Sequence, residues 1–175
     1  MKTKKICILG ILTAMFVALA MALRVPVFDN FYLCLGYVAM YIAIYLYDIF
    51  GGLIVGTIGT SIYCILISGL RGLPGWIVGN ICISVFVGLW MRFTKKHAGK
   101  LYWTILTELI IVVSTAIGML IFKSLTEVII YAQPMWLRIT TNFPAFITDS
   151  IVLCVSIPIC KLLNFKSQTH TTAEG

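Results

Sequence analysis

Charge is scarce in this sequence. Only 11% of the 175 residues are Asp, Glu, Lys or Arg, whereas 61% are hydrophobic, and the mean hydropathy is +1.04. A typical soluble domain has about 25% charged residues. So little charge could not cover the surface of a water-soluble globule, which disfavours soluble enzymes, disordered chains and nucleic-acid-binding domains. The composition indicates a protein whose solvent is the lipid bilayer.

Motifs that carry catalysis or hold metals are also missing. The sequence has no G-x-x-x-x-G-K-[ST] phosphate loop, no H-E-x-x-H and no G-x-S-x-G. No two of the six cysteines form a C-x-x-C pair, and neither His97 nor His170 has a partner at metal-ligand spacing. No histidine lies in an apolar run, so a membrane hydrolase would lack a base for its nucleophile. We therefore expect no enzyme activity, no metal and no cofactor.

Six apolar runs are long enough to cross a membrane, since a spanning helix needs about 20 apolar residues. They lie at residues 6–23, 31–48, 51–69, 74–91, 101–122 and 141–162. We predict an all-α membrane protein with one six-helix domain over residues 1–166 and a disordered polar tail over 167–175. The first run follows a basic start, as in a signal peptide, but it exceeds the usual length of about 7–15 residues, so we expect it to be retained.

The distribution of Lys and Arg predicts the orientation. With the amino terminus inside, nine of the 13 basic residues lie at the inner ends of the predicted spans and four lie outside. The four outer residues are Arg24, Arg71, Lys123 and Arg138. Cytoplasmic loops carry the excess of Lys and Arg, so we expect both termini in the cytoplasm.

Among the polar residues inside predicted spans, where polar groups are costly and often functional, three are candidates for a binding site. Asp149 lies in the last span with Asn142, and Asn80 lies in the fourth span one turn after Trp76. They could line a polar cavity open to the outside, or they could form hydrogen bonds between helices. For Asn80 and Asn142 both interpretations stand, whereas for Asp149 we favour the cavity.

The predicted outer loops add candidate binding groups. Arg71 lies among glycines and a proline, so its guanidinium could fold over a site that Trp76 also borders. Arginines outside are unexpected for orientation and suit a ligand with a carboxylate or phosphate, although lipid headgroups would serve as well. Tyr41 belongs to a tyrosine stripe of spacing four that could stack a flat ring or simply pack. Asp48, before two glycines, is expected to be a turn residue.

Small residues recur every four positions in several spans, which lets helices approach closely. In the first span they are Ala14, Ala18 and Ala22. This stripe could pack within the bundle or face a partner protein. For Gly52 and Gly56 in the third span we expect internal packing.

The order of these motifs resembles the substrate-binding (S) component of energy-coupling factor (ECF) vitamin transporters, in its riboflavin-type branch. The alanine stripe is followed by Asn30-Phe-Tyr-Leu-Cys-Leu-Gly36, then by Gly51-Gly52-Leu-Ile-Val-Gly56, and finally by Gly72-Leu-Pro74-Gly75-Trp76-Ile-Val-Gly79-Asn80. The likeness in motifs covers about the first ninety residues, and the remainder agrees in hydropathy and number of spans.

The resemblance implies a function and partners. An S component of this kind lies in the bacterial plasma membrane, binds a vitamin or precursor from outside, and has no ATPase of its own. It joins a transmembrane coupling subunit and two cytoplasmic ATPases. The alanine face of the first helix contacts the coupling subunit, which implies that role for Ala14, Ala18 and Ala22. Trp76 and Asn80 match the binding region in place.

The sequence leaves the solute open. The arginines favour an anion such as pantothenate or a folate, whereas the aromatic residues allow riboflavin, a pyridine, a pyrimidine or cobalamin. The alternative function is a small multi-span scaffold of the cell-envelope machinery, which would bind no solute. Candidate solute-binding residues are Tyr41, Arg71, Trp76, Asn80, Asn142 and Asp149.

Overall fold

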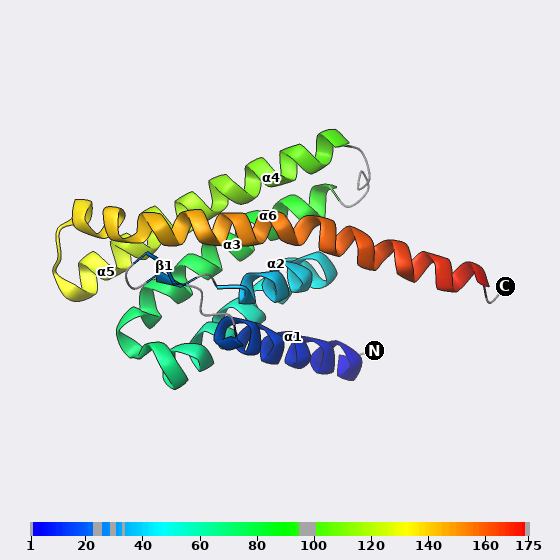
Figure 1. Ribbon diagram of the computed structural model, residues 1–175, viewed down its shortest axis with the longest axis horizontal. Helices are drawn as coiled ribbons and strands as arrows, with labels where there is room; N and C mark the ends of the chain where they lie inside the picture. Colours follow the sequence, from blue (N-terminus) through cyan, green and yellow to red (C-terminus); the bar gives the residue numbers. More distant parts are fainter. Residues whose placement is uncertain (1, 23–25, 29–30, 33, 95–100, 174–175) are drawn as a thin grey trace.

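The computed structural model describes residues 2–22, 26–28, 31–32, 34–94 and 101–173. They form a bundle of long helices whose chain termini lie at the same end (Figure 1). Among the described residues, five helices are long and apolar enough to cross a membrane. They cover Thr3–Ala22, Gly36–Ile67, Leu73–Thr94, Leu101–Tyr131 and Met135–Leu162. Arg24, Lys95, Lys96, His97 and Lys100, which entered the prediction of orientation or of metal ligands, lie outside the described residues.

The chain begins with helix α1 (Lys2–Ala22) and continues with two short antiparallel strands, β1 (Pro26–Phe28) and β2 (Phe31–Tyr32). The prediction of a helix from residue 31 is wrong at this point. Phe31 and Tyr32 pair with Phe28 and Pro26, and helix α2 (Gly36–Tyr63) begins only after this ribbon.

Helix α2 folds back on itself at Asp48, whose backbone has φ 58° and ψ −144°. Gly51 approaches Ala43, and a Cβ on Gly56 would lie 3.0 Å from the sulfur of Met40. A continuous helix could not bring together residues this far apart along the chain. The first arm (residues 36–47) and the second arm (residues 49–63) therefore pack antiparallel, which confirms Asp48 as a turn residue.

The remaining elements complete the bundle. A π-helix, η1 (Cys64–Ser68), and a 3₁₀ turn, η2 (Leu70–Gly72), lead into α3 (Leu73–Thr94). Helix α4 (Leu101–Thr115) continues through the π-helix η4 (Ala116–Lys123) into α5 (Ser124–Tyr131), and α6 spans Met135–Ala173.

One further predicted boundary differs from the structure. Residues 123–131 were expected in a loop, but they continue the helix of the fifth span as α5. The physical reason is that this segment contains no Gly or Pro that would end a helix. At the other end of the chain, α6 is helical to Ala173 and projects beyond the bundle (Figure 1).

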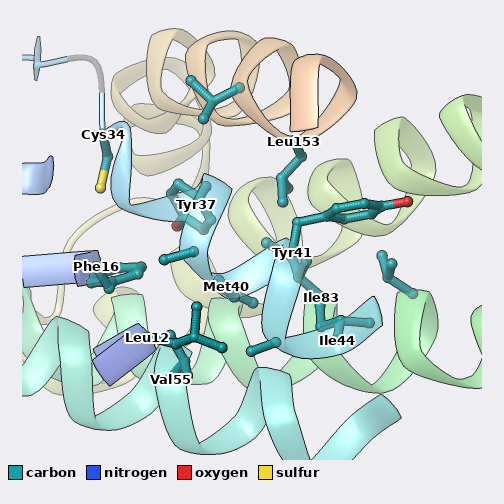
Figure 2. Packing of buried hydrophobic residues seen from close by; sticks show 14 of the residues in the cluster. Leu12, Phe16, Cys34, Tyr37, Met40, Tyr41, Ile44, Val55, Ile83 and Leu153 are labelled. Atoms are coloured by element: carbon teal, nitrogen blue, oxygen red, sulfur yellow. The ribbon is translucent and has the colours of Figure 1, made fainter. Parts of the chain in front are cut away.

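The core lies where α1, α3 and α6 meet the two arms of α2 (Figure 2). Phe16 of α1 is fully buried against Gly36 and Gly59, one from each arm. Any side chain at either glycine would collide with the ring. Because lipid tails are as apolar as the core, close packing of this kind stabilises the bundle more than burial from water does.

Candidate functional site

The hydroxyl of Tyr37 joins α2 to α3 inside the bundle. It donates a hydrogen bond to Oδ1 of Asn80 at 2.8 Å and accepts one from the indole Nε1 of Trp76 at 2.7 Å. Tyr37 is completely buried, as Figure 2 illustrates. A buried hydroxyl that both donates and accepts a hydrogen bond satisfies its polar groups without water. The two hydrogen bonds therefore hold the Tyr37 side chain in one orientation.

Asn80 uses its amide group to hold both arms of α2. Its Nδ2 donates to the backbone oxygen of Gly56 at 3.1 Å and to Oγ1 of Thr60 at 2.7 Å, while its Oδ1 accepts from Tyr37. Gly56 permits this approach, since its missing Cβ would lie 3.4 Å from the Asn80 side chain. Of the two roles considered for Asn80, the structure contains the hydrogen bonds between helices.

Asp149 of α6 completes this group of buried polar side chains. It is 4% exposed and lies within interaction range of the Tyr37 hydroxyl and the Lys123 ammonium. It also faces Cys34, whose thiol pKa is raised, first by burial and then by the charge of Asp149. We call Tyr37, Thr60, Trp76, Asn80 and Asp149 the polar cluster.

Next to the polar cluster lies a buried carboxylate, Glu127 of α5. Its Oε2 accepts a hydrogen bond from Nδ2 of Asn142 at 3.0 Å and lies 3.5 Å from Nη1 of Arg138. The same Asn142 nitrogen donates to Oγ of Ser124 at 3.1 Å. These contacts tie α5 to the first turns of α6.

Lys123 connects the two groups, since both Glu127 and Asp149 attract its ammonium and its Nζ lies 6.0 Å from the centre of the Trp76 ring. Asp149, Lys123, Glu127 and Arg138 thus form a series of alternating charges, which we call the charge series. The series contains two acids and two bases, so their formal charges cancel.

The structure brings together most of the predicted site residues. Trp76, Asn80 and Asp149 share the polar cluster, and Asn142 lies next to it through Glu127. Tyr41 is separate, because its hydroxyl is directed toward the sulfur of Met91 at 4.0 Å and away from the Tyr37 hydroxyl (Figure 2). Arg71 lies in η2, and its side chain is outside the described part.

Sequence reasoning did not select Tyr37, Thr60, Lys123 or Glu127. Tyr37 and Tyr41 belong to one stripe of spacing four, and the pattern alone does not tell which ring faces the polar residues. For Lys123 and Glu127 a signal was present. Opposite charges four residues apart pair on one face of a helix, which indicates that the fifth span continues past Lys123.

Helix α1 presents small side chains on its outward face, away from the rest of the bundle. Ala14, Ala18 and Ala22 are all exposed, and a Cβ on Gly10 would meet no atom within 4 Å. The buried face of α1 is formed by other residues, among them Phe16 and Val17. The alanine stripe is therefore not used for packing among the described residues.

The family model of the ECF-type riboflavin transporter S component matches residues 1–164. The chain belongs to this family. No curated protein and no solved structure matches it. The match extends the resemblance seen in the first ninety residues to the later helices, where Asp149 and the charge series lie.

Membership decides the general function. This S component is a multi-pass membrane protein that binds a vitamin-like substrate and works in uptake with ECF transporter partners. The family is one of transporters and not of enzymes. Its buried polar side chains are accordingly candidates for solute recognition and not for catalysis.

Proposed function

We propose that this S component captures a vitamin from outside the cell at the polar cluster and the charge series. The observation that carries the proposal is the gathering of Tyr37, Trp76, Asn80, Asp149 and Lys123 from four elements of the bundle. Polar and ionisable side chains inside a membrane bundle are costly to bury, and they commonly mark the path of a substrate.

We infer six crossings with both termini in the cytoplasm of a bacterial plasma membrane. In this proposal the two antiparallel arms of α2 count as two of the six crossings, and their reversal at Asp48 supports this assignment. The amino-terminal half of α1, which contains Lys5, and the carboxyl-terminal half of α6, which contains Lys161, lie toward the end of the bundle that holds the termini (Figure 1). Helix α5 and the first turns of α6 lie at the opposite end, where acids balance Lys123 and Arg138. An excess of basic residues on one side favours a cytoplasmic position for that side.

The solute that fits best is an uncharged, flat ring. The charge series contains as many acids as bases, so an anion would meet Glu127 and Asp149 as well as the two cations. Trp76 and Tyr63, whose rings meet edge to face with centroids 5.6 Å apart, offer aromatic surface beside Lys123. Riboflavin, which is named in the family description, is uncharged and flat, and we take it as the first candidate.

Binding of riboflavin to the purified chain tests this proposal. Riboflavin fluorescence should be quenched on binding, and Asp149→Asn should weaken the affinity by about tenfold, the effect of one hydrogen bond to a charged group. Arg71→Ala should weaken it too if the guanidinium folds over the site. Glu108→Gln is the matched control, because Glu108 is exposed on α4 and its variant should bind as the wild type does.

A wild-type chain that binds neither riboflavin nor any copurifying vitamin identified by mass spectrometry would contradict the proposal and favour the scaffold function. Full affinity in Asp149→Asn would instead remove Asp149 from the site.

Energy for uptake comes from partners in this proposal. The S component joins a transmembrane coupling subunit and two cytoplasmic ATPases. The outward stripe of Ala14, Ala18 and Ala22 is the proposed contact with the coupling subunit, and its exposure on α1 supports this assignment. Small side chains let a second helix approach closely, which is a main source of helix association in lipid.

A further inference from the structure

Lys123 is a partly buried cation whose hydrogen-bonding capacity is unused. An ammonium has three donors. In the part of the chain that the structure describes, no hydrogen bond and no direct ion pair ends on the Lys123 Nζ, although Glu127 and Asp149 are near enough to attract it. A second unused donor lies close by, because the buried Nε of Arg138 has no partner among the described residues.

Glu127 is fixed in the position from which it attracts Lys123. It is 5% exposed, its Oε2 accepts from Asn142, and its side chain lies against Gly75. A Cβ on Gly75 would lie 3.0 Å from both Cγ and Oε1 of Glu127 and 3.1 Å from Cγ of Lys123. Gly75 immediately precedes Trp76, so the absent side chain lets both charged residues settle next to the indole.

Both cations therefore interact with one well-oriented carboxylate, and Lys123 keeps free donors beside the Trp76 ring. A solute with hydrogen-bond acceptors on the edge of a flat ring would fill those donors. An uncharged ring without acceptors would leave them empty, and unfilled buried donors lower affinity strongly.

We propose that Lys123 donates a hydrogen bond to an acceptor on the ring edge of the bound vitamin, and that Glu127 is the positioning residue that holds the ammonium beside Trp76. This inference rests on the proposed function and assigns the residue that selects acceptor-bearing rings. Glu127 acts through Lys123 and does not touch the solute.

The first test is a double-mutant cycle with riboflavin as the probe and fluorescence quenching as the readout. Lys123→Met and Glu127→Gln should each weaken binding by about tenfold. The double variant should bind no more weakly than Lys123→Met alone, because Glu127 has no effect once the ammonium is gone. Lys161→Met and Glu108→Gln make the same chemical changes elsewhere, at a lysine bonded to Thr104 and at an exposed glutamate, and should leave the affinity unchanged.

The second test changes the solute, and it does not depend on the stability of the Glu127 variant. Two riboflavin analogues are compared, each with one ring carbonyl oxygen replaced by sulfur, which is a weaker acceptor. The wild type should lose affinity for at least one analogue relative to riboflavin. Lys123→Met should show no such difference, because the donor that distinguishes oxygen from sulfur is absent.

The outcomes separate this inference from the function on which it rests. A wild type that binds no riboflavin overturns the riboflavin assignment and this inference together. A wild type that binds riboflavin, with Lys123→Met within twofold of it or equally sensitive to the sulfur analogues, overturns the role of Lys123 alone. If the fold-losses in riboflavin affinity of the two single variants multiply in the double variant, the positioning role of Glu127 is overturned and Lys123 remains the donor.

Discussion

At the scale of single residues, the backbone of Asp48 is the clearest case of strain. Its φ of 58° with ψ −144° belongs to a region that only glycine adopts easily. The strain lies between the arms of α2, where the chain must reverse within a few residues. Gly51 follows three residues later and packs on Ala43, so the two arms are close together directly after the reversal.

Two substitutions isolate the energy of this strain. Asp48→Gly and Asp48→Ala both remove the carboxylate, but only glycine relieves the backbone. We expect the glycine variant to be more stable than the alanine variant by about 1 kcal/mol, after allowing for the greater freedom of unfolded glycine. Thermal unfolding in detergent measures the difference. Equal stability of the two variants would show that residue 48 does not hold this conformation.

The polar residues show which single-residue predictions succeed. Asn80 and Asp149 could be selected from the sequence because amides and acids within a span are rare and costly. Trp76 could be selected because tryptophan is typical of the ends of membrane helices and because it belongs to the motif that resembles the family. Their partners could not be selected. Tyr37 lies 43 positions from Asn80 and Thr60 lies 20 positions away, and no local pattern connects them.

At the scale of elements, α3 and η4 cross at two glycines. A Cβ on Gly118 would lie 2.9 Å from the backbone oxygen of Gly79, and a Cβ on Gly79 would lie 3.2 Å from that of Gly118. The crossing lies in the π-helical stretch that ends at Lys123. Gly79 lies three residues after Trp76 on α3, and Gly118 lies five residues before Lys123 on η4, so this crossing sets where Lys123 stands relative to Trp76.

Filling the crossing should separate the two elements. Gly118→Ala places a methyl group against a backbone oxygen that cannot rotate away, so we expect a loss of about 1–3 kcal/mol in stability. Gly10→Ala is the matched control, since nothing lies within 4 Å of that position and its stability should not fall. Unfolding in detergent distinguishes the two variants, and an undiminished stability in Gly118→Ala would refute the close crossing.

Helix ends were harder to predict than helices. The apolar runs fall on the five long helices, with two of the runs overlapping the two arms of α2, but Lys123 and Glu127 lower the hydropathy and suggest a loop where the helix continues as α5. The charges do not end the helix, because each finds an oppositely charged neighbour. Hydropathy measures transfer to lipid and does not include such pairing.

At the scale of the whole molecule, the bundle separates the two surfaces to which we assign solute binding and partner contact. The polar cluster lies inside, between α2, α3 and α6, whereas the alanine stripe of α1 faces outward. Phe16 connects them, because it packs between the arms of α2 on the other side of the same helix. Changes on the alanine stripe should therefore affect partner association without altering the solute site.

Bulky side chains on the stripe test this separation. Ala14→Trp with Ala18→Trp should abolish copurification with the coupling subunit and leave riboflavin affinity within about twofold, since both positions are exposed. Val112→Trp with Val113→Trp enlarges two exposed positions on α4 instead and should leave copurification intact. If the α1 variant still copurifies with the coupling subunit, the assignment of this face is wrong.

The sequence by itself determined that this protein is a bundle of apolar helices of the S component family. That is so because the length and hydropathy of a run report its solvent directly, and the motif order reports ancestry. Only the tertiary structure decided that Tyr37 and not Tyr41 meets Asn80, that Lys123 stands beside Trp76, and that the alanine stripe is free. Each of these depends on which helix faces lie against one another, and in lipid that choice rests on close packing and interhelical hydrogen bonds, which leave little trace in hydropathy.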